Sequence, residues 1–264
     1  MGMRTTLFLG IMLLLTSSTW AQTTPKSSGA NSNSKSTALK PTTTTPASKD
    51  PIGDADRLLS RGDAMAQDQQ SLAILEGALT TDGKNYDLLW RAARAAYYVG
   101  DFGVEADKLK YFDKGVAFAQ RAVTAKPDAV EGHFWLAANY GGKAQLVGAL
   151  KALSTVKKIR SEMQAVVKLD DKYENGNAYL ALGEIDRELP GIMGGDKKRS
   201  MSLYEQGLKV APENLDLKIA LAKAFQNVKR NDEAKKLLQE VVQATATTRI
   251  QREAQEEAKQ LLNK

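Results

Sequence analysis

The 264-residue chain contains a single histidine and no cysteine, which limits the chemistry that its side chains can perform. Cys–His dyads, thiolate zinc sites and multi-histidine zinc sites are therefore excluded. Ser154 and Lys157 match a Ser-x-x-Lys acyl-transfer motif, but the motifs that accompany it in enzymes are missing. Residues 194–198 have the glycines of a phosphate-binding turn, but they lack the Walker spacing, and Asp196 would repel an anion. We therefore predict a protein without catalytic residues, metal or cofactor.

The side chains best suited to binding lie near the middle of the chain. His133 is followed directly by Phe134 and Trp135, with Asn139 and Tyr140 shortly after. On the expected helix His133 faces the partner helix, as either a hydrogen-bonded core residue or a ligand contact. Phe134 falls on the face that lines a groove, whereas Trp135 and Asn139 share another stripe because they are four residues apart. A buried Asn amide needs partners, so Asn139 either ties elements together or meets a ligand.

A second group of polar side chains is predicted on the same concave face. It consists of Glu184, Arg187, Lys223 and Asn227. Such groups either clamp a peptide or an anionic ligand, or form a solvated face. We expect this group and the residues around His133 to contact the ligand or partner.

A loop rich in glycine and proline separates two of the expected helices. Pro190, Gly194 and Gly195 lie in it, and Asp196 follows where the N-cap of the next helix is expected. The loop acts either as a flexible lip over the groove or as a rigid connection between helices.

Apolar periodicity indicates the elements that position these side chains. Residues 231–242 carry apolar side chains at helical spacing, and residues 217–228 carry a second stripe just before them. Weaker copies of this hairpin end near Pro127 and Pro212. A period of about 34 residues with a closing proline is typical of tetratricopeptide (TPR) repeats, which stack into a solenoid that binds partners. The sequence therefore predicts an all-α, TPR-like solenoid.

We expect about five helix pairs and a C-terminal capping helix, as repeat proteins require a polar cap. Turns are predicted at Gly100–Asp101 and Gly141–Gly142, and a kink near Gly148 or Ser154. The predicted helices are 54–67, 69–80, 86–99, 106–125, 128–140, 143–169, 176–189, 196–210, 217–228, 231–242 and 248–262.

The N-terminal residues differ in composition from the rest. Arg4, an apolar run over 7–15 and a small-residue site before Gln22 indicate a secretory signal peptide over 1–21. That run is too short for a transmembrane helix, so no span is expected after cleavage. Residues 22–51 are rich in Ser, Thr and Pro and are predicted to be disordered, which leaves 52–264 as the folded domain. Without a cysteine there is no lipobox, so we expect a periplasmic or secreted protein.

The net charge of +6 does not indicate a nucleic-acid-binding protein. Residues 1–51 contain five basic residues against Asp50, so most of the excess lies outside the expected domain. The rest of the chain has no long basic run with interleaved aromatic residues, which proteins that track a nucleic-acid backbone need.

Several segments resemble a known family. They are 115–119, 122–123 with Pro127, 132–141, 156–159, Tyr173, 182–183, Leu189–Pro190 and 194–196. With them, residues 115–242 resemble the T-component proteins of bacterial TRAP transporters, the TatT-like family of exported, degenerate TPR proteins. The resemblance implies a protein that self-associates, acts beside a periplasmic solute-binding protein and holds a small, partly apolar ligand. The alternative is an envelope or cell-wall assembly protein that is tethered through its Ser/Thr-rich segment.

Overall fold

The computed structural model describes residues 49–146 and 149–263. The predicted signal peptide, nearly all of the predicted linker and the proposed kink at Gly148 lie outside this part of the chain. The described residues form eleven α-helices and no strand, which confirms the all-α prediction. The helices are α1 (Pro51–Leu58), α2 (Met65–Thr81), α3 (Tyr86–Phe102), α4 (Glu105–Ala125), α5 (Val130–Leu146), α6 (Ala149–Leu169), α7 (Asn177–Glu188), α8 (Lys197–Val210), α9 (Leu215–Asn227), α10 (Asn231–Gln243) and α11 (Arg249–Leu262).

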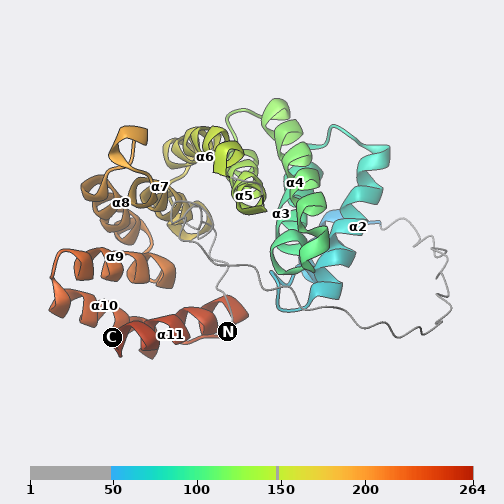
Figure 1. Ribbon diagram of the computed structural model, residues 1–264. Helices are drawn as coiled ribbons and strands as arrows, with labels where there is room; N and C mark the ends of the chain where they lie inside the picture. The colour runs from blue at the N-terminus through green and yellow to red at the C-terminus, as the bar shows by residue number, and fades with distance from the viewer. Residues whose placement is uncertain (1–48, 147–148, 264) are drawn as a thin grey trace, which may run out of the picture.

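Successive helices pack as antiparallel hairpins and build a solenoid. The odd-numbered helices contact one another along its inner side, as the α3–α5, α7–α9 and α9–α11 contacts show. The even-numbered helices from α4 to α10 pack against them from outside. In Figure 1 the helices follow an arc, and α11 turns back below it toward the first helices. The start of α11 therefore approaches the first hairpin across the concave side of the solenoid.

Two apolar clusters hold the hairpins together. The first joins α1 to α7 around side chains such as Phe112 and Trp135, and the second joins α7 to α11 around Tyr204 and Leu217. All four side chains are almost completely buried. Burial of this kind of aromatic and aliphatic surface is the main favourable term in the stability of a solenoid.

Two predicted turns are wrong, because Gly100–Asp101 lies inside α3 and Gly141–Gly142 lies inside α5. The glycines make room for Phe112 instead of breaking the helices. A Cβ on Gly142 would lie 2.2 Å from the Phe112 ring, and a Cβ on Gly100 would lie 3.0 Å from it. Small residues here allow close approach of α3, α4 and α5 around one buried phenylalanine.

The first hairpin also differs from the prediction. The predicted helix 54–67 is wrong, since α1 ends at Leu58 and α2 begins at Met65, whereas the predicted helix 69–80 is confirmed and lies within α2. The predicted long helix 143–169 is divided between α5 and α6, and Ser154 lies within α6.

The C-terminal half follows the sequence pattern closely. Residues 215–227 and 231–243 form the α9–α10 hairpin, and Thr248 caps α11 in a capping box with Gln251. Asp196 caps α8, as predicted, by accepting hydrogen bonds from the backbone of Lys198 and Arg199. Among the described helices, none has the length and apolar character that crossing a bilayer requires.

Candidate binding cavity in the concave face

A cavity of about 280 Å³ lies where the end of the solenoid meets its beginning. Its wall is built from parts of the chain that are far apart in sequence. These are Arg61 from the α1–α2 loop, Tyr97, Tyr98 and Asp101 from α3, Glu174 and Asn175 from the turn before α7, Asn177 and Leu180 from α7, residues 213–216 before and in α9, and the N-cap Thr248 with Ile250, Gln251, Glu253 and Ala254 of α11.

The loop that carries Arg61 is shaped by Asp68, whose side chain is completely buried in α2. The Asp68 carboxylate accepts hydrogen bonds from the backbone nitrogens of Ser60, Arg61 and Gly62 at 2.6, 3.1 and 2.7 Å. It also accepts one from the Ser60 hydroxyl at 2.9 Å. These bonds hold Arg61 in the left-handed region, with a φ of 56°, which a side chain of its type rarely adopts. Asp68 thus fixes the loop that places Arg61 in the wall.

The opposite wall contains a second left-handed stretch, Glu174, Asn175 and Gly176. The Asn214 side chain holds it by donating to the Asn175 carbonyl at 2.7 Å. Glu174 then pairs with Arg61 through two hydrogen bonds of 3.0 and 3.3 Å. Backbone strain of this kind is concentrated at sites where the surrounding structure fixes a side chain for function.

Asp101 is the most deeply buried carboxylate of the cavity, with only 7% of its surface exposed. Burial raises its pKa to about 7, and Lys108 only partly offsets that effect. The Tyr97 hydroxyl hydrogen-bonds to this carboxyl group, and burial also raises the pKa of Tyr97. Asp101 therefore exchanges its proton near neutral pH, and a cation that enters the cavity stabilises the charged carboxylate.

The N-terminus of α11 closes the cavity against the first hairpin. The backbone nitrogen of Arg249 donates to the Asp63 carboxylate at 2.8 Å, and Arg252 pairs with the same carboxylate at 3.6 Å. The Arg249 guanidinium also lies over the ring of Phe102, 4.9 Å from its centre. These contacts join residues from opposite ends of the domain.

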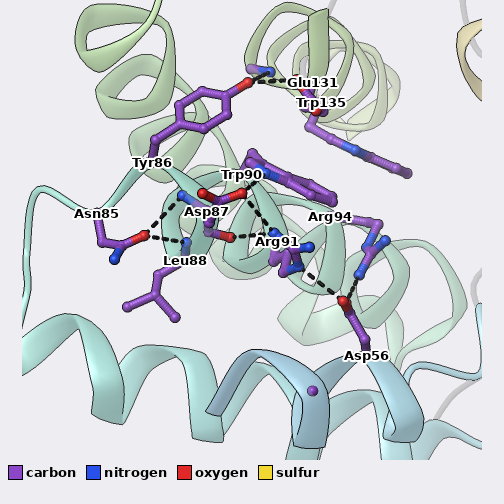
Figure 2. A network of polar contacts seen from close by, with 12 residues as sticks. Asp56, Asn85, Tyr86, Asp87, Leu88, Trp90, Arg91, Arg94, Glu131 and Trp135 are labelled. Atoms are coloured by element: carbon purple, nitrogen blue, oxygen red, sulfur yellow. Dashed lines mark hydrogen bonds and ion pairs between the residues drawn. The ribbon is translucent and has the colours of Figure 1, made fainter. Parts of the chain in front are cut away.

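A polar network behind the cavity fixes α3 between its neighbours (Figure 2). Asp56 of α1 pairs with Arg91 at 3.0 Å and also with Arg94. Both guanidinium groups lie over the Trp90 ring, at 4.1 and 4.9 Å from its centre. On the other side, the Tyr86 hydroxyl of α3 donates to Glu131 of α5 at 2.7 Å. The network sets the position of the helix that carries Asp101.

The charge of the cavity is mostly negative. Its lining includes the carboxylates Asp101, Glu174, Glu213, Asp216 and Glu253. Among the described residues, Arg61 is the only basic side chain in that lining, and it neutralises Glu174. Glu253 is paired with Arg249, which lies outside the lining. In the described part of the chain no group of three or more His, Asp or Glu side chains is placed to hold a metal ion. The arrangement therefore favours an organic cation, which Tyr97 and Tyr98 can also contact through their rings.

Three of the predicted groove residues come together in a second polar group beside the cavity. Glu184 pairs with Arg187 and accepts a hydrogen bond of 2.7 Å from Tyr204. Lys223 of α9 pairs with Glu257 of α11. Glu188 pairs with Arg187. Burial raises the pKa of Glu188, and the positive charges of Arg187 and Lys223 act in the opposite direction. These charges are largely paired within the protein.

The predicted residues around His133 occupy structural positions. His133 faces the partner helix, as predicted, with Nδ1 2.6 Å from Glu162 and Nε2 2.8 Å from the Pro127 carbonyl. Phe134 was expected on the groove, but it is 1% exposed and packs edge-on against Trp135 and Tyr173.

Trp135 and Asn139 share one buried stripe, as the spacing predicted. Trp135 donates to the Tyr173 hydroxyl at 3.1 Å, and Tyr173 directly precedes the left-handed stretch of the cavity. Asn139 ties elements together, since it donates to the Ala93 carbonyl of α3 at 3.0 Å and to Trp135 at 2.8 Å. Neither residue lines the cavity.

The remaining predicted residues lie apart from the cavity. Tyr140 accepts a hydrogen bond of 2.9 Å from Gln120, and Asn227 is exposed at the end of α9. Pro190, Gly194 and Gly195 form the connection between α7 and α8, which contains hydrogen bonds within the loop.

The sequence prediction missed every side chain that lines the cavity. Local turn signals were present, because Arg61-Gly62 and Asn175-Gly176 are typical of left-handed turns. These signals mark two loops, but nothing in the local sequence indicates that the loops meet each other and α11.

Comparisons with known proteins identify two matching families. The family model described as "Regulator of microtubule dynamics protein 1-3" matches residues 52–184, and a "Tetratricopeptide repeat" model matches residues 194–256. No curated protein matches the sequence. The resemblance to TRAP T-components therefore stays a prediction, while the TPR character is confirmed.

Solved structures that resemble this one include a TPR protein. TTC0263, a thermophilic TPR protein of Thermus thermophilus, is 15% identical, with a TM-score of 0.59, and the match covers 80% of this chain and 98% of that one. The MamA RS-1 ArsTM double mutant is also 15% identical, with a TM-score of 0.50, and the match covers 75% of this chain and 94% of that one. At such identities the likeness shows the fold alone: a TPR-type scaffold suited to protein–protein interaction.

Because the first family model spans half of its 264 residues, the chain belongs to the regulator of microtubule dynamics protein 1-3 family.

Proposed function

We propose that this chain is a non-enzymatic, exported TPR scaffold of the TRAP T-component type, which binds a periplasmic partner protein through its concave face. The solute-binding protein of a transporter is the partner that the resemblance implies. The proposal is supported by the solenoid fold, since concave surfaces are what repeat proteins use for binding. The family description refers to microtubule dynamics. From it we infer for this chain only that it associates with other proteins.

Within this proposal the cavity receives a basic side chain of the partner. This is the observation on which the proposal depends: five carboxylates and two tyrosines line a space of about 280 Å³, and two of the carboxylates, Glu174 and Glu253, are paired with arginines. A lysine or arginine side chain fits such a space. It is stabilised there by the negative charge of the carboxylates and by cation–π contacts with the tyrosine rings. The negative lining favours a cation over the small apolar ligand that the resemblance implied.

The role of the buried acid follows from its pKa. Asp101 is largely protonated in the empty cavity below pH 7, because burial disfavours its charged form. A basic side chain stabilises the carboxylate, so binding releases a proton. Affinity for a basic partner should therefore increase as the pH rises through 7, and the Asp101→Asn variant should lose that dependence.

The test is a capture experiment with charge-reversed variants of the full chain, purified from its own host. Glu213 is an exposed acid at the rim of the cavity, and Asp107 is an exposed acid on the outer helix α4. Wild type and Asp107→Lys should retain the same protein from a periplasmic extract, and Glu213→Lys should lose it. Equal retention by all three would contradict the cavity as the binding site.

Export is tested separately by cell fractionation. A chain that begins at Gln22 and is released with the periplasmic contents supports it. A full-length chain that stays with the cytoplasm would contradict export but would leave the capture result standing, so the two parts of the proposal can fail independently.

A further inference from the structure

The loop between α7 and α8 presents an unusually exposed apolar side chain. Ile192, in a single 3-10 turn (Gly191–Met193), is 99% exposed, and Met193 beside it is 40% exposed. Single exposed aliphatic residues are common on proteins, so exposure alone indicates little. What distinguishes this loop is how firmly the protein holds it.

The loop is anchored by a buried ion-pair network. Asp186 of α7 has no exposed surface, and it binds Arg160 of α6 at 2.6 Å and Arg199 of α8 at 2.7 Å. Arg199 also donates to the Gly194 carbonyl at 2.8 Å. The backbone of Asp196 donates to the Asp186 carbonyl at 2.8 Å. Three helices thus converge on the base of the loop.

The turn itself permits little movement. The Pro190 carbonyl accepts hydrogen bonds from Met193 at 2.8 Å and from Gly195 at 3.2 Å. Gly194 has a φ of +89°, and a Cβ on Gly195 would lie 1.8 Å from the Leu189 carbonyl oxygen. These contacts constrain the loop in a conformation in which Ile192 is exposed to solvent.

Exposed lysines lie on two helices that contact this loop. Lys197 and Lys198 are exposed in the first turn of α8, and Lys157 of α6 is exposed one helical turn before Arg160, which contacts the loop. The residue before Lys197, the N-cap Asp196, is an exposed acid and offsets part of this charge. Three lysines against one aspartate leave a net positive charge beside the apolar tip.

We propose that this loop docks on the surface of an anionic phospholipid bilayer. Ile192 and Met193 insert between the headgroups, while Lys197, Lys198 and Lys157 contact lipid phosphates. Charge complementarity favours this occupant, since exposed lysines beside an apolar tip match an anionic interface. A protein partner would have to supply a pocket of matching shape, whereas a bilayer accepts any rigid projection. The loop lies at the edge of the arc in Figure 1, away from the concave cavity.

Vesicle co-sedimentation of the full chain tests the proposal. The probes are vesicles of phosphatidylglycerol and phosphatidylcholine, with vesicles of phosphatidylcholine alone as the comparison. We expect the wild type to bind the anionic vesicles at least about tenfold better than the neutral ones, and high salt to weaken the binding.

Two kinds of variant locate the contact. Ile192→Glu should reduce binding to anionic vesicles about tenfold, and the double change Lys197→Glu with Lys198→Glu should do the same. The matched control is Val228→Glu, which places the same charge on another exposed aliphatic residue, 53% exposed in the α9–α10 turn. It should bind as the wild type does. All these positions are exposed, so circular dichroism should show unchanged helix content. Failure of the wild type to bind anionic vesicles, or wild-type binding by Ile192→Glu, would overturn the proposal.

Discussion

Replacing Asp101 with Asn should change how the stability of the protein depends on pH. The carboxyl group is 7% exposed, and burial raises its pKa from 3.8 to about 7. The folded state therefore holds the proton more tightly than the unfolded state does. In the wild type this stabilising effect is complete below about pH 4 and is lost as the pH rises through about 7. Asn carries no charge, so the variant does not experience this loss.

The size of the effect follows from the shift. Three pKa units correspond to about 4 kcal/mol of unfolding free energy, of which roughly 2 to 3 kcal/mol is lost between pH 5 and pH 8. The free energy of unfolding of Asp101→Asn, minus that of the wild type, should therefore grow by roughly 2 to 3 kcal/mol over this range. Other titrating groups are present in both proteins, so their contributions cancel in the difference.

The assay is urea unfolding at pH 5, 6, 7 and 8, followed by tryptophan fluorescence and circular dichroism. Asp107→Asn, at an exposed acid of α4, is the control for a general effect of removing one negative charge. A difference between Asp101→Asn and the wild type that stays the same from pH 5 to pH 8 would refute the reasoning. It would mean that the carboxyl group is hydrated in the folded protein and that the cavity is not closed around it.

Three further changes test other parts of the structure. Asp68→Ala leaves the backbone donors of Ser60, Arg61 and Gly62 without their carboxylate, so it should lower the free energy of unfolding by about 3 kcal/mol; a loss below 1 kcal/mol in urea unfolding would show that water replaces the bonds. Gly115→Ala places a Cβ 1.9 Å from Asn139 Oδ1, so it should cost about 2 kcal/mol in the same assay, and the loss should shrink when Asn139 is also changed to Ala; equal losses in both backgrounds would contradict the contact. Asp63→Ala removes the acceptor for Arg249 at an exposed site, so the free energy of unfolding should change by less than about 1 kcal/mol. Hydrogen exchange at the start of α11 should nevertheless become faster. Unchanged exchange there would show that this contact does not hold α11 against the first hairpin.

The helices were predictable where a residue's role is set by its neighbours in sequence. The α9–α10 hairpin, the C-terminal helix α11 and the N-cap at Asp196 all depend on periodicity and capping within a few residues. Gly100 and Gly142 were misinterpreted as turns because their role depends on Phe112, which lies on another helix. Asp68 was missed for the same reason, since a buried carboxylate that organises a loop carries no local signature.

The cavity could not be predicted because it lies where the two ends of the solenoid approach each other. Glu253 and Asp101 are more than 150 residues apart in the sequence, and they approach only because α11 returns to the first hairpins. Phe134 was wrongly assigned to the groove. Adjacent positions of a helix face different sides, and Phe134 is buried in the core. By contrast, Glu184, Arg187 and Lys223 do gather on one side, because their spacing follows the inner helices directly.

Site-specific photo-crosslinking in living cells tests the central claim most directly. The photoreactive residue p-benzoylphenylalanine is placed at Ile250, which lines the cavity, or at Gln206, which is exposed on the outer helix α8. Our account predicts a cross-link to a partner protein from position 250 and none from position 206, with the attached segment next to a lysine or arginine. Cross-links from position 206 alone, or none from position 250, would contradict a concave cavity that receives a basic side chain.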